Sequence, residues 1–135
     1  MESVGHEAVT LTSYGVLDAD MFARVRAIVP DDGLKAKRLA NLARASRVVV
    51  ASAMDGRPVG VAYARTIFGI PNVTWIVAAE ARRQGVATRI VTELQKSCTF
   101  LTAICRNEPS IRVARRSGFT LAFGRFAVWM RRPRP

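Results

Sequence analysis

Few residues of this sequence could hold a metal ion or form a disulfide. Its 135 residues include two cysteines and one histidine, too few for the ligand sets of common zinc sites. If residues 99–104 form a strand, the Cα atoms of Cys98 and Cys105 are about 20 Å apart, whereas a disulfide needs them within about 7 Å. We therefore expect two free thiols and no metal, and we assign no catalytic role to His6.

The sequence also lacks long apolar runs. None approaches the roughly 20 residues that a membrane span needs, and the N-terminus lacks the basic and then apolar stretches of a secretory signal. These absences predict a cytoplasmic protein with no membrane partner. The length suits a single domain over residues 1–135, in which we expect the basic tail, residues 131–135, to be disordered.

Acidic residues are also few. The chain has ten of them and 21 lysines and arginines, which gives a net charge of +11. Such a charge favours an anionic partner, namely a phosphorylated cofactor, an acidic protein or nucleic acid, although solvated surface arginines explain it equally well. The two Trp, two Tyr and six Phe residues do not interleave with the basic runs, so base stacking on nucleic acid is poorly supported.

Hydrophobic periodicity predicts strands and helices in the order β-α-α-β-β-β-α-β-α-β-β, which describes a mixed sheet with helices on both faces. The helices are expected between Asp18 and Pro30, over 34–45, from the turn at Gly85 to Cys98, and from Asn107 to Gly118. A turn is expected at Gly69 to Asn72. The expected strands are 7–14, 47–53, 59–68, 73–77, 99–105, 119–123 and 125–131.

The most informative motif is the run from Arg82 to Ala87, Arg-Arg-Gln-Gly-Val-Ala, which follows a strand and opens a helix. The first amides of a helix lack internal partners, and the helix dipole adds positive charge there. Gly85 lets the backbone approach a ligand closely, and Arg82 and Arg83 can donate charge-assisted hydrogen bonds. The pattern predicts an anion site suited to a cofactor that bears a pyrophosphate.

The element order and two motifs resemble the GCN5-related N-acetyltransferase (GNAT) family over nearly the whole chain. Residues 82–87 fit its cofactor signature: Arg or Gln, two residues, Gly, one residue, then Gly or Ala. Residues 107–111, with 117–119, look like its second signature, in which Asn opens a helix closed by Gly-Phe. The resemblance implies an α/β (α+β) fold, with a mixed, mostly antiparallel sheet of six to seven strands and a splayed parallel strand pair.

The resemblance also implies that acetyl-CoA lies between the two splayed strands. The backbone of residues 75–77 would pair with the pantetheine arm, and the Val77 amide would face the thioester carbonyl. The amides of residues 83–88 would hold the pyrophosphate, and Asn107 and Ser110 would lie near the reactive end. The implied cofactor-binding residues are Trp75, Ile76, Val77, Arg82, Arg83, Gln84, Gly85, Val86, Ala87, Thr88, Asn107 and Ser110.

Simpler roles remain open for the same residues. Arg82 and Arg83 could be surface cations, Gly85 a turn glycine, and Asn107 and Ser110 helix caps. Further along the chain, Arg112, Arg115 and Arg116 share one helix face, where they stabilise the helix or additionally contact the adenosine 3′-phosphate.

The catalytic residues stay unassigned. Many relatives use a tyrosine four residues before the Gly-Phe as general acid, and here that residue is Ala114. Enzymes that acetylate ribosomal-protein N-termini place a glutamate five residues before the Asn, and here that residue is Thr102. Either a water relay reaches one of four weak candidates, the acceptor amine has a low pKa, or catalysis is lost. The weak candidates are Asp31, Asp32, Tyr63 and Cys105.

Together these features predict an acetyl-CoA-dependent N-acetyltransferase that acts on the amine of a small molecule by direct transfer in a ternary complex. The alternative is a catalytically silent protein of the same fold that binds nucleic acid or an acidic protein through its arginines. Final strands that pair across a dimer are common in the family, so a homodimer also stays open.

Overall fold

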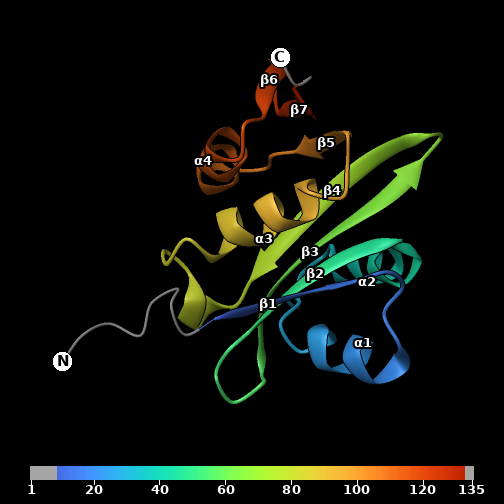
Figure 1. Cartoon of the computed structure of the whole chain (residues 1–135), viewed down its shortest axis with the longest axis vertical. Helices are drawn as coiled ribbons and strands as arrows, with labels where there is room; N and C mark the ends of the chain where they lie inside the picture. Colours follow the sequence, from blue (N-terminus) through green and yellow to red (C-terminus); the bar gives the residue numbers. More distant parts are fainter. Residues whose placement is uncertain (1–8, 133–135) are drawn as a thin grey trace.

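The computed structural model describes residues 9–132, which form a seven-stranded sheet in the order β1-β2-β3-β4-β5-β7-β6 (Figure 1). All neighbouring strands are antiparallel except β4 and β5, which are parallel. The predicted mixed sheet and element order are therefore confirmed. The strands are β1 Thr10–Tyr14, β2 Arg47–Ser52, β3 Pro58–Ile67, β4 Ile70–Val77, β5 Phe100–Ile104, β6 Thr120–Phe123 and β7 Phe126–Met130.

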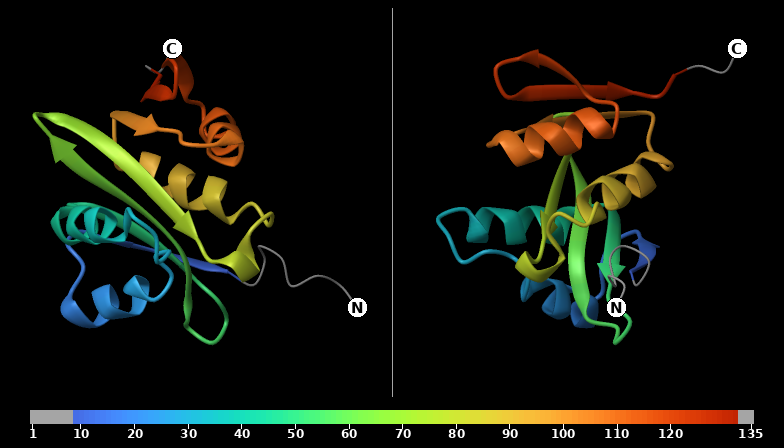
Figure 2. Two further views of the ribbon diagram at one scale, coloured as in Figure 1. Left: turned by 180° about the vertical axis from the view of Figure 1, so that it is seen from behind. Right: turned by 90° about the vertical axis from the view of Figure 1, so that its left-hand side faces the viewer.

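Helices cover both faces of the sheet, as the periodicity predicted. On β2, Val49 and Ala51 point into a core beneath α3 and α4, whereas Val48 and Val50 point into a second core beneath α1 and α2. The right-hand view of Figure 2 shows α2 and α3 on opposite sides of the strands. The helices are α1 Ala19–Arg26, α2 Lys35–Arg44, α3 Val86–Gln95 and α4 Glu108–Arg116, with a short 3₁₀ helix, η2, at Ala79–Ala81.

Local capping explains where two of the helices begin. The Asp18 carboxylate accepts a hydrogen bond from the Met21 amide (2.8 Å) at the start of α1. At the start of α4, the Asn107 side chain accepts from the Ser110 amide (3.0 Å), and the Ser110 hydroxyl accepts from the Asn107 amide (3.2 Å). Both caps occupy positions that the sequence predicted, because capping depends on residues within one turn of chain.

The turn before β4 was predicted wrongly. The expected turn at Gly69 to Asn72 is instead a two-residue turn at Phe68 and Gly69, whose φ angles are +52° and +79°. Two consecutive positive φ angles suit the tight turn of a hairpin. As a result β4 begins at Ile70, and Pro71 pairs with Thr66 inside the ladder.

Smaller differences between the predicted and the observed structure lie at the chain ends and at the boundaries of helices and strands. Helix α3 ends at Gln95 and does not reach Cys98, and both cysteines are free, as predicted. Residues 7 and 8 of the first expected strand lie outside the described residues, as do 133–135 of the tail. Arg131 departs from the expected disordered tail, because its guanidinium donates to the carbonyl of Lys96 (2.6 Å) and its amide donates to that of Thr99 (2.9 Å).

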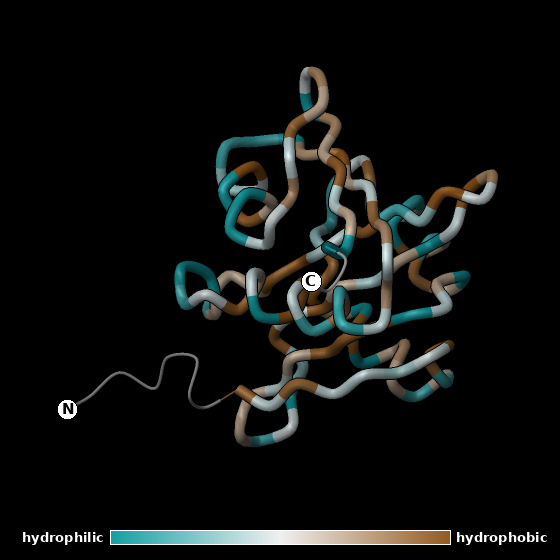
Figure 3. Tube along the Cα trace, turned by 45° about the horizontal axis from the view of Figure 1, so that its top comes forward, coloured by the Kyte–Doolittle hydropathy of each residue, from teal (hydrophilic) through white to brown (hydrophobic). Residues whose placement is uncertain are grey.

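Hydropathy follows this architecture. Figure 3 shows hydrophobic residues (brown) along the central strands and hydrophilic residues (teal) recurring on the outer segments. In the part of the chain that the structure describes, no helix combines the length and the apolar character that crossing a bilayer requires.

Candidate functional site

The parallel strands β4 and β5 separate soon after they meet. Within residues 9–132, they pair at a single position, Asn72 opposite Thr102. Beyond it, Val73–Val77 stay paired with β3 along their other edge. In Figure 1, β5 lies beside the first half of β4 only. The later part of β4 is therefore left with a backbone edge that β5 does not use.

A side-chain contact marks the point where the two strands part. The Thr102 hydroxyl accepts a hydrogen bond from the Asn72 side-chain amide (3.1 Å) and donates one to the Pro71 carbonyl (3.0 Å). Thr102 is 2% exposed. Because both hydrogen bonds join β5 to β4, the Thr102 hydroxyl ties the strands together at this position.

Thr102→Val should loosen this junction. Valine has nearly the same shape but leaves a half-buried Asn72 amide group without its partner, so we expect the free energy of unfolding to fall by about 1–3 kcal/mol. Thr102→Ser keeps the hydroxyl and serves as the control. Chemical denaturation of the two variants and the wild type checks the expectation, and equal losses in both variants would contradict it.

Two side chains of the glycine turn at Gly85 hold it against the end of β4 and against η2. The Arg82 Nε donates to the Val77 carbonyl (3.2 Å), and the Gln84 side-chain amide donates to the Glu80 carbonyl (3.3 Å). Arg83 and Gly85 have φ angles of +67° and +76° and are exposed. A Cβ built on Gly85 meets no atom within 4 Å, so the space above this turn is open.

The N-termini of α3 and α4 differ in how their amides are satisfied. The first amides of α4 are capped by Asn107 and Ser110, so the predicted helix-cap role of these two residues is confirmed. Gly85 is the N-cap residue of α3 and has no side chain to accept a hydrogen bond, and no other side chain caps this helix. The first amides of α3, those of residues 86–88, therefore receive no side-chain cap, and the positive end of the helix dipole lies at this turn.

The sequence analysis missed Gly60, a residue that positions the start of α3. It lies on β3 opposite Val77, and a Cβ built on it would be 3.0 Å from Cγ1 of Val86, the first residue of α3. Val86 and Ile90 are buried against this part of the sheet. Gly60 thus lets the N-terminus of α3 approach the sheet closely. A glycine inside a predicted strand was the available signal.

Comparison with known proteins decides what this architecture is. Residues 17–119 match the profile of the Acetyltransferase (GNAT) family. The chain belongs to this family. The predicted family and fold are therefore confirmed, and GNAT membership makes the protein an enzyme of the acetyltransferase class. No curated protein sequence matches the chain.

Solved GNAT structures share the fold at low sequence identity. A phosphinothricin acetyltransferase from Sinorhizobium meliloti, in complex with AcCoA, is 20% identical, with coverage of 88% of this chain and 86% of that chain and a TM-score of 0.66. The GNAT family N-acetyltransferase YhbS from Escherichia coli, in complex with CoA, is 17% identical. The match covers 96% of this chain and 84% of that chain, with a TM-score of 0.65. Ribosomal-protein-S5-alanine acetyltransferase from Vibrio fischeri is 18% identical. The match covers 96% of this chain and 97% of that chain, with a TM-score of 0.62.

Two of the catalytic candidates, Tyr63 and Cys105, are buried in this GNAT protein where they are poorly suited to catalysis. Tyr63 is buried beneath α2, its hydroxyl donates to the Arg38 carbonyl (3.4 Å), and burial raises its pKa to about 12. Cys105 is buried in the core beneath α3 and α4, and burial raises the pKa of its thiol. A phenol so weakly acidic and a buried neutral thiol are unsuited to proton transfer or acyl transfer near pH 7.

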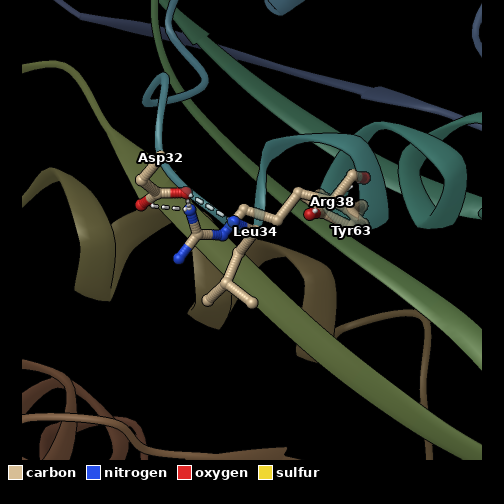
Figure 4. Close-up of polar contacts among 4 residues, drawn as sticks. All are labelled: Asp32, Leu34, Arg38 and Tyr63. Carbon is tan, nitrogen blue, oxygen red and sulfur yellow. Dashed lines mark hydrogen bonds and ion pairs between the residues drawn. The ribbon is translucent and has the colours of Figure 1, made fainter.

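Asp32 has a structural role in the connection between α1 and α2 (Figure 4). Its carboxylate accepts hydrogen bonds from the Leu34 amide (2.9 Å) and, through both oxygens, from the Arg38 guanidinium (3.0 Å each). These partners, the Leu34 amide first, lower the pKa of Asp32, so it is a weak base. Asp31 is exposed beside it. Both aspartates precede α2. The buried residues of α2 belong to the core beneath α1 and α2, which lies on the face of the sheet opposite α3.

Two other features bear on what the site can hold. A surface hollow of about 340 Å³ lies between α1, the start of β3 and η2, and it does not include residues 82–88. Among residues 9–132, no group of three or more His, Cys, Asp or Glu side chains is arranged to bind a metal.

Proposed function

We propose that this GNAT protein transfers an acetyl group from acetyl-CoA to the amine of a small molecule, by direct transfer in a ternary complex. The observation that carries the proposal is the uncapped N-terminus of α3, which begins at a left-handed glycine beneath open space. The solved GNAT enzymes from S. meliloti and E. coli hold AcCoA and CoA, respectively.

The residues at this turn fit the diphosphate of coenzyme A. The amides of Val86, Ala87 and Thr88 supply donors that the protein does not use for capping. Exposed Arg83 adds positive charge, and Arg82 holds the turn against β4. In this assignment Gln84 and Gly85 shape the turn, so all of residues 82–88 belong to the cofactor site.

The free edge of β4 fits the pantetheine arm, which carries amide groups of its own. We assign this contact to the backbone of Trp75, Ile76 and Val77, with the Val77 amide donating to the thioester oxygen. Asn107 and Ser110 are assigned to the reactive end. Capping occupies the oxygen of the Asn107 side chain and leaves its NH₂ group for this contact.

Acetyl-CoA supplies an activated acyl group whose thiol, with a pKa near 8.5, leaves readily. What the protein must add is a neutral amine, because an alkylamine with a pKa near 10 is mostly protonated at pH 7. The Thr102 hydroxyl already makes two hydrogen bonds, and Ala114 has no proton to give. We therefore propose an acceptor amine of low pKa, or a water relay to a carboxylate.

A small-molecule acceptor fits this chain better than a protein N-terminus. Thr102 and Ala114 depart from the pattern of the enzymes that acetylate ribosomal proteins, although one of the similar structures is such an enzyme. A net charge of +11 suits an acceptor that carries acidic groups. The protein is proposed to act in the cytoplasm as a single domain spanning residues 1–135.

Thermal unfolding with different ligands separates this proposal from a silent GNAT protein that binds nucleic acid or an acidic protein. Acetyl-CoA at 100 times its dissociation constant should add about 2.7 kcal/mol to the free energy of unfolding. Stabilisation by DNA that falls steeply with salt, with none by acetyl-CoA, would favour the silent protein. An acceptor screen that measures free thiol then identifies the amine.

A further inference from the structure

Arg65 on β3 is a half-buried cation that has no acidic partner among residues 9–132. In this range, its guanidinium makes one side-chain contact, a hydrogen bond from Nη1 to the side-chain oxygen of Asn41 on α2. By contrast, the guanidinium of Arg38 is paired with both carboxylate oxygens of Asp32 (Figure 4). A guanidinium has five N–H donors and stays charged, and a charge removed from water needs a partner. Arg65 therefore has a charge and donors to offer to a ligand.

Strand register places Arg65 beside the point where β4 and β5 part. Arg65 lies opposite Asn72 on β4, and Asn72 lies opposite Thr102 on β5. Directly opposite residues of paired strands point to the same face, and the hydrogen bond between Asn72 and Thr102 continues the row onto β5. Val61 and Tyr63, on the same face of β3 as Arg65, belong to the core beneath α1 and α2. The row therefore lies on the face of the sheet opposite α3.

The sheet is narrow at Arg65. Strand β2 begins at Arg47, opposite Ala64, so β3 has no strand on that edge from Arg65 onward. Figure 1 shows the hairpin of β3 and β4 (light green) projecting past β2, and residues 67–70 at its tip are exposed. On the other face of the hairpin, Ala64 and Val73 are buried in the core beneath α3 and α4. A molecule that reaches the row thus approaches from the side of Arg65 and not from that of α3.

We propose that Arg65 binds a carboxylate of the acetyl acceptor, so that the substrate class is amines that also carry a carboxylate. The inference rests on the proposed function, in which acetyl-CoA lies between β4 and β5. The hydrogen bond to Asn41 uses Nη1 and leaves Nε and Nη2, which together match the two oxygens of a carboxylate. Because Asn41 is neutral, it orients the guanidinium without cancelling its charge.

The spacing within the row suits a compact amino acid. Arg65 and Thr102 are separated by two strand spacings, about 10 Å between their backbones. An amino acid whose carboxylate lies on Arg65 directs its amine toward the opening that begins at Thr102. In this role Arg65 determines specificity, because it selects and orients the acceptor and takes no proton from it.

Acetyl transfer to paired amines tests the assignment. The probes are glycine, β-alanine and γ-aminobutyrate, each compared with its carboxamide, which keeps the amine and lacks the negative charge. We expect kcat/KM for at least one acid to exceed that for its amide about 100-fold or more. A carboxylate raises the pKa of a nearby amine, so amine basicity alone would favour the amides.

Arg65→Met keeps the aliphatic stem of the side chain and should abolish the preference for the acid. Arg47→Met is the matched control. Arg47 is an exposed cation at the same end of the sheet, and it lies opposite Ala64 on the α3 face. The control should keep the preference in full.

Asn41→Asp separates ligand binding from a purely structural role of Arg65. The new carboxylate gives Arg65 a partner within the protein and competes with the carboxylate of the acceptor. We expect kcat/KM for the acids to fall about tenfold or more, with the amides unchanged and no loss of stability in chemical denaturation. A structural Arg65 would tolerate this new ion pair without any change in specificity.

Glutarate, a dicarboxylate without an amine, gives a readout that needs no catalysis. Calorimetric titration should show a dissociation constant about tenfold or more lower for the wild type than for Arg65→Met and Asn41→Asp, and glutaramide should not bind. Absent glutarate binding, or equal affinities of the wild type and Arg65→Met, would overturn the proposal. An acid preference that survives Arg65→Met, or is lost equally in Arg47→Met, would also overturn it. Absent acetyl-CoA binding in every variant would instead refute the proposed function, and a difference in glutarate affinity would still identify Arg65 as a carboxylate site.

Discussion

Gly85→Asp is expected to lower the affinity for acetyl-CoA about 100-fold or more. The carboxylate would point into the open space above the turn, where a Cβ meets no protein atom within 4 Å, and would face the diphosphate. Like charges placed in contact cost several kcal/mol. The fold should survive, because the position tolerates a side chain sterically and its φ of +76° is open to Asp and Asn at a modest cost of about 1 kcal/mol.

Gly85→Asn is the matched control for charge, since its side chain has the size and shape of Asp. It removes the close approach that glycine allows and should weaken acetyl-CoA binding about tenfold. Isothermal titration of both variants, with circular dichroism to verify folding, measures the difference. Equal affinities of the Asp and Asn variants would show that no phosphate lies at this turn, and the site assignment would then fail.

Gly60→Ala is expected to act on both stability and cofactor affinity, although Gly60 lies on β3 and not in the turn. The added methyl would come within 3.0 Å of Cγ1 of Val86, so the first turn of α3 must shift by a few tenths of an ångström. Overpacking of this kind costs about 1–3 kcal/mol. The same shift moves the amides of α3, and we expect acetyl-CoA affinity to fall about tenfold.

Gly33→Ala is the control for glycine removal in general. A Cβ at Gly33 meets nothing within 4 Å, and no positive φ is required there, so its effect on the free energy of unfolding should stay within about 0.5 kcal/mol. Denaturant unfolding and acetyl-CoA titration of both variants give the two readouts. If Gly60→Ala lost stability but kept full acetyl-CoA affinity, the N-terminus of α3 would not be the phosphate-binding element.

Much of the fold was predictable because its signals are local or periodic. Residues 47–53 were predicted to form a strand and the element order predicted helices on both faces of the sheet, and the structure places a helical layer on each face of β2. Asp18 and Asn107 were recognisable as caps because each bonds an amide three residues away. The family was recognisable from Arg82–Ala87 and the Asn107 motif, since each occupies one strand-to-helix connection.

Errors arose where a single residue had to override its usual preference. Phe68 takes a left-handed conformation, with φ of +52°. Bulky aromatic residues rarely adopt this conformation, so the sequence does not predict it. The predicted turn consequently began one residue too late and ended three residues too late. Arg131 was assigned to a solvated tail because it opens a run of Arg and Pro. Its guanidinium instead reaches the carbonyl groups that end α3.

By itself, the sequence determined the order of strands and helices, the caps, the glycine turn and the family, because each of these depends on residues that are near one another in the chain. Only the tertiary structure decided where β4 and β5 part, why Gly60 is a glycine, and which strand pairs with the other edge of β5. Those features depend on strand register and on helix packing. Asn72 meets Thr102, Gly60 meets Val86, and Phe100 meets Met130 only after distant segments are placed side by side.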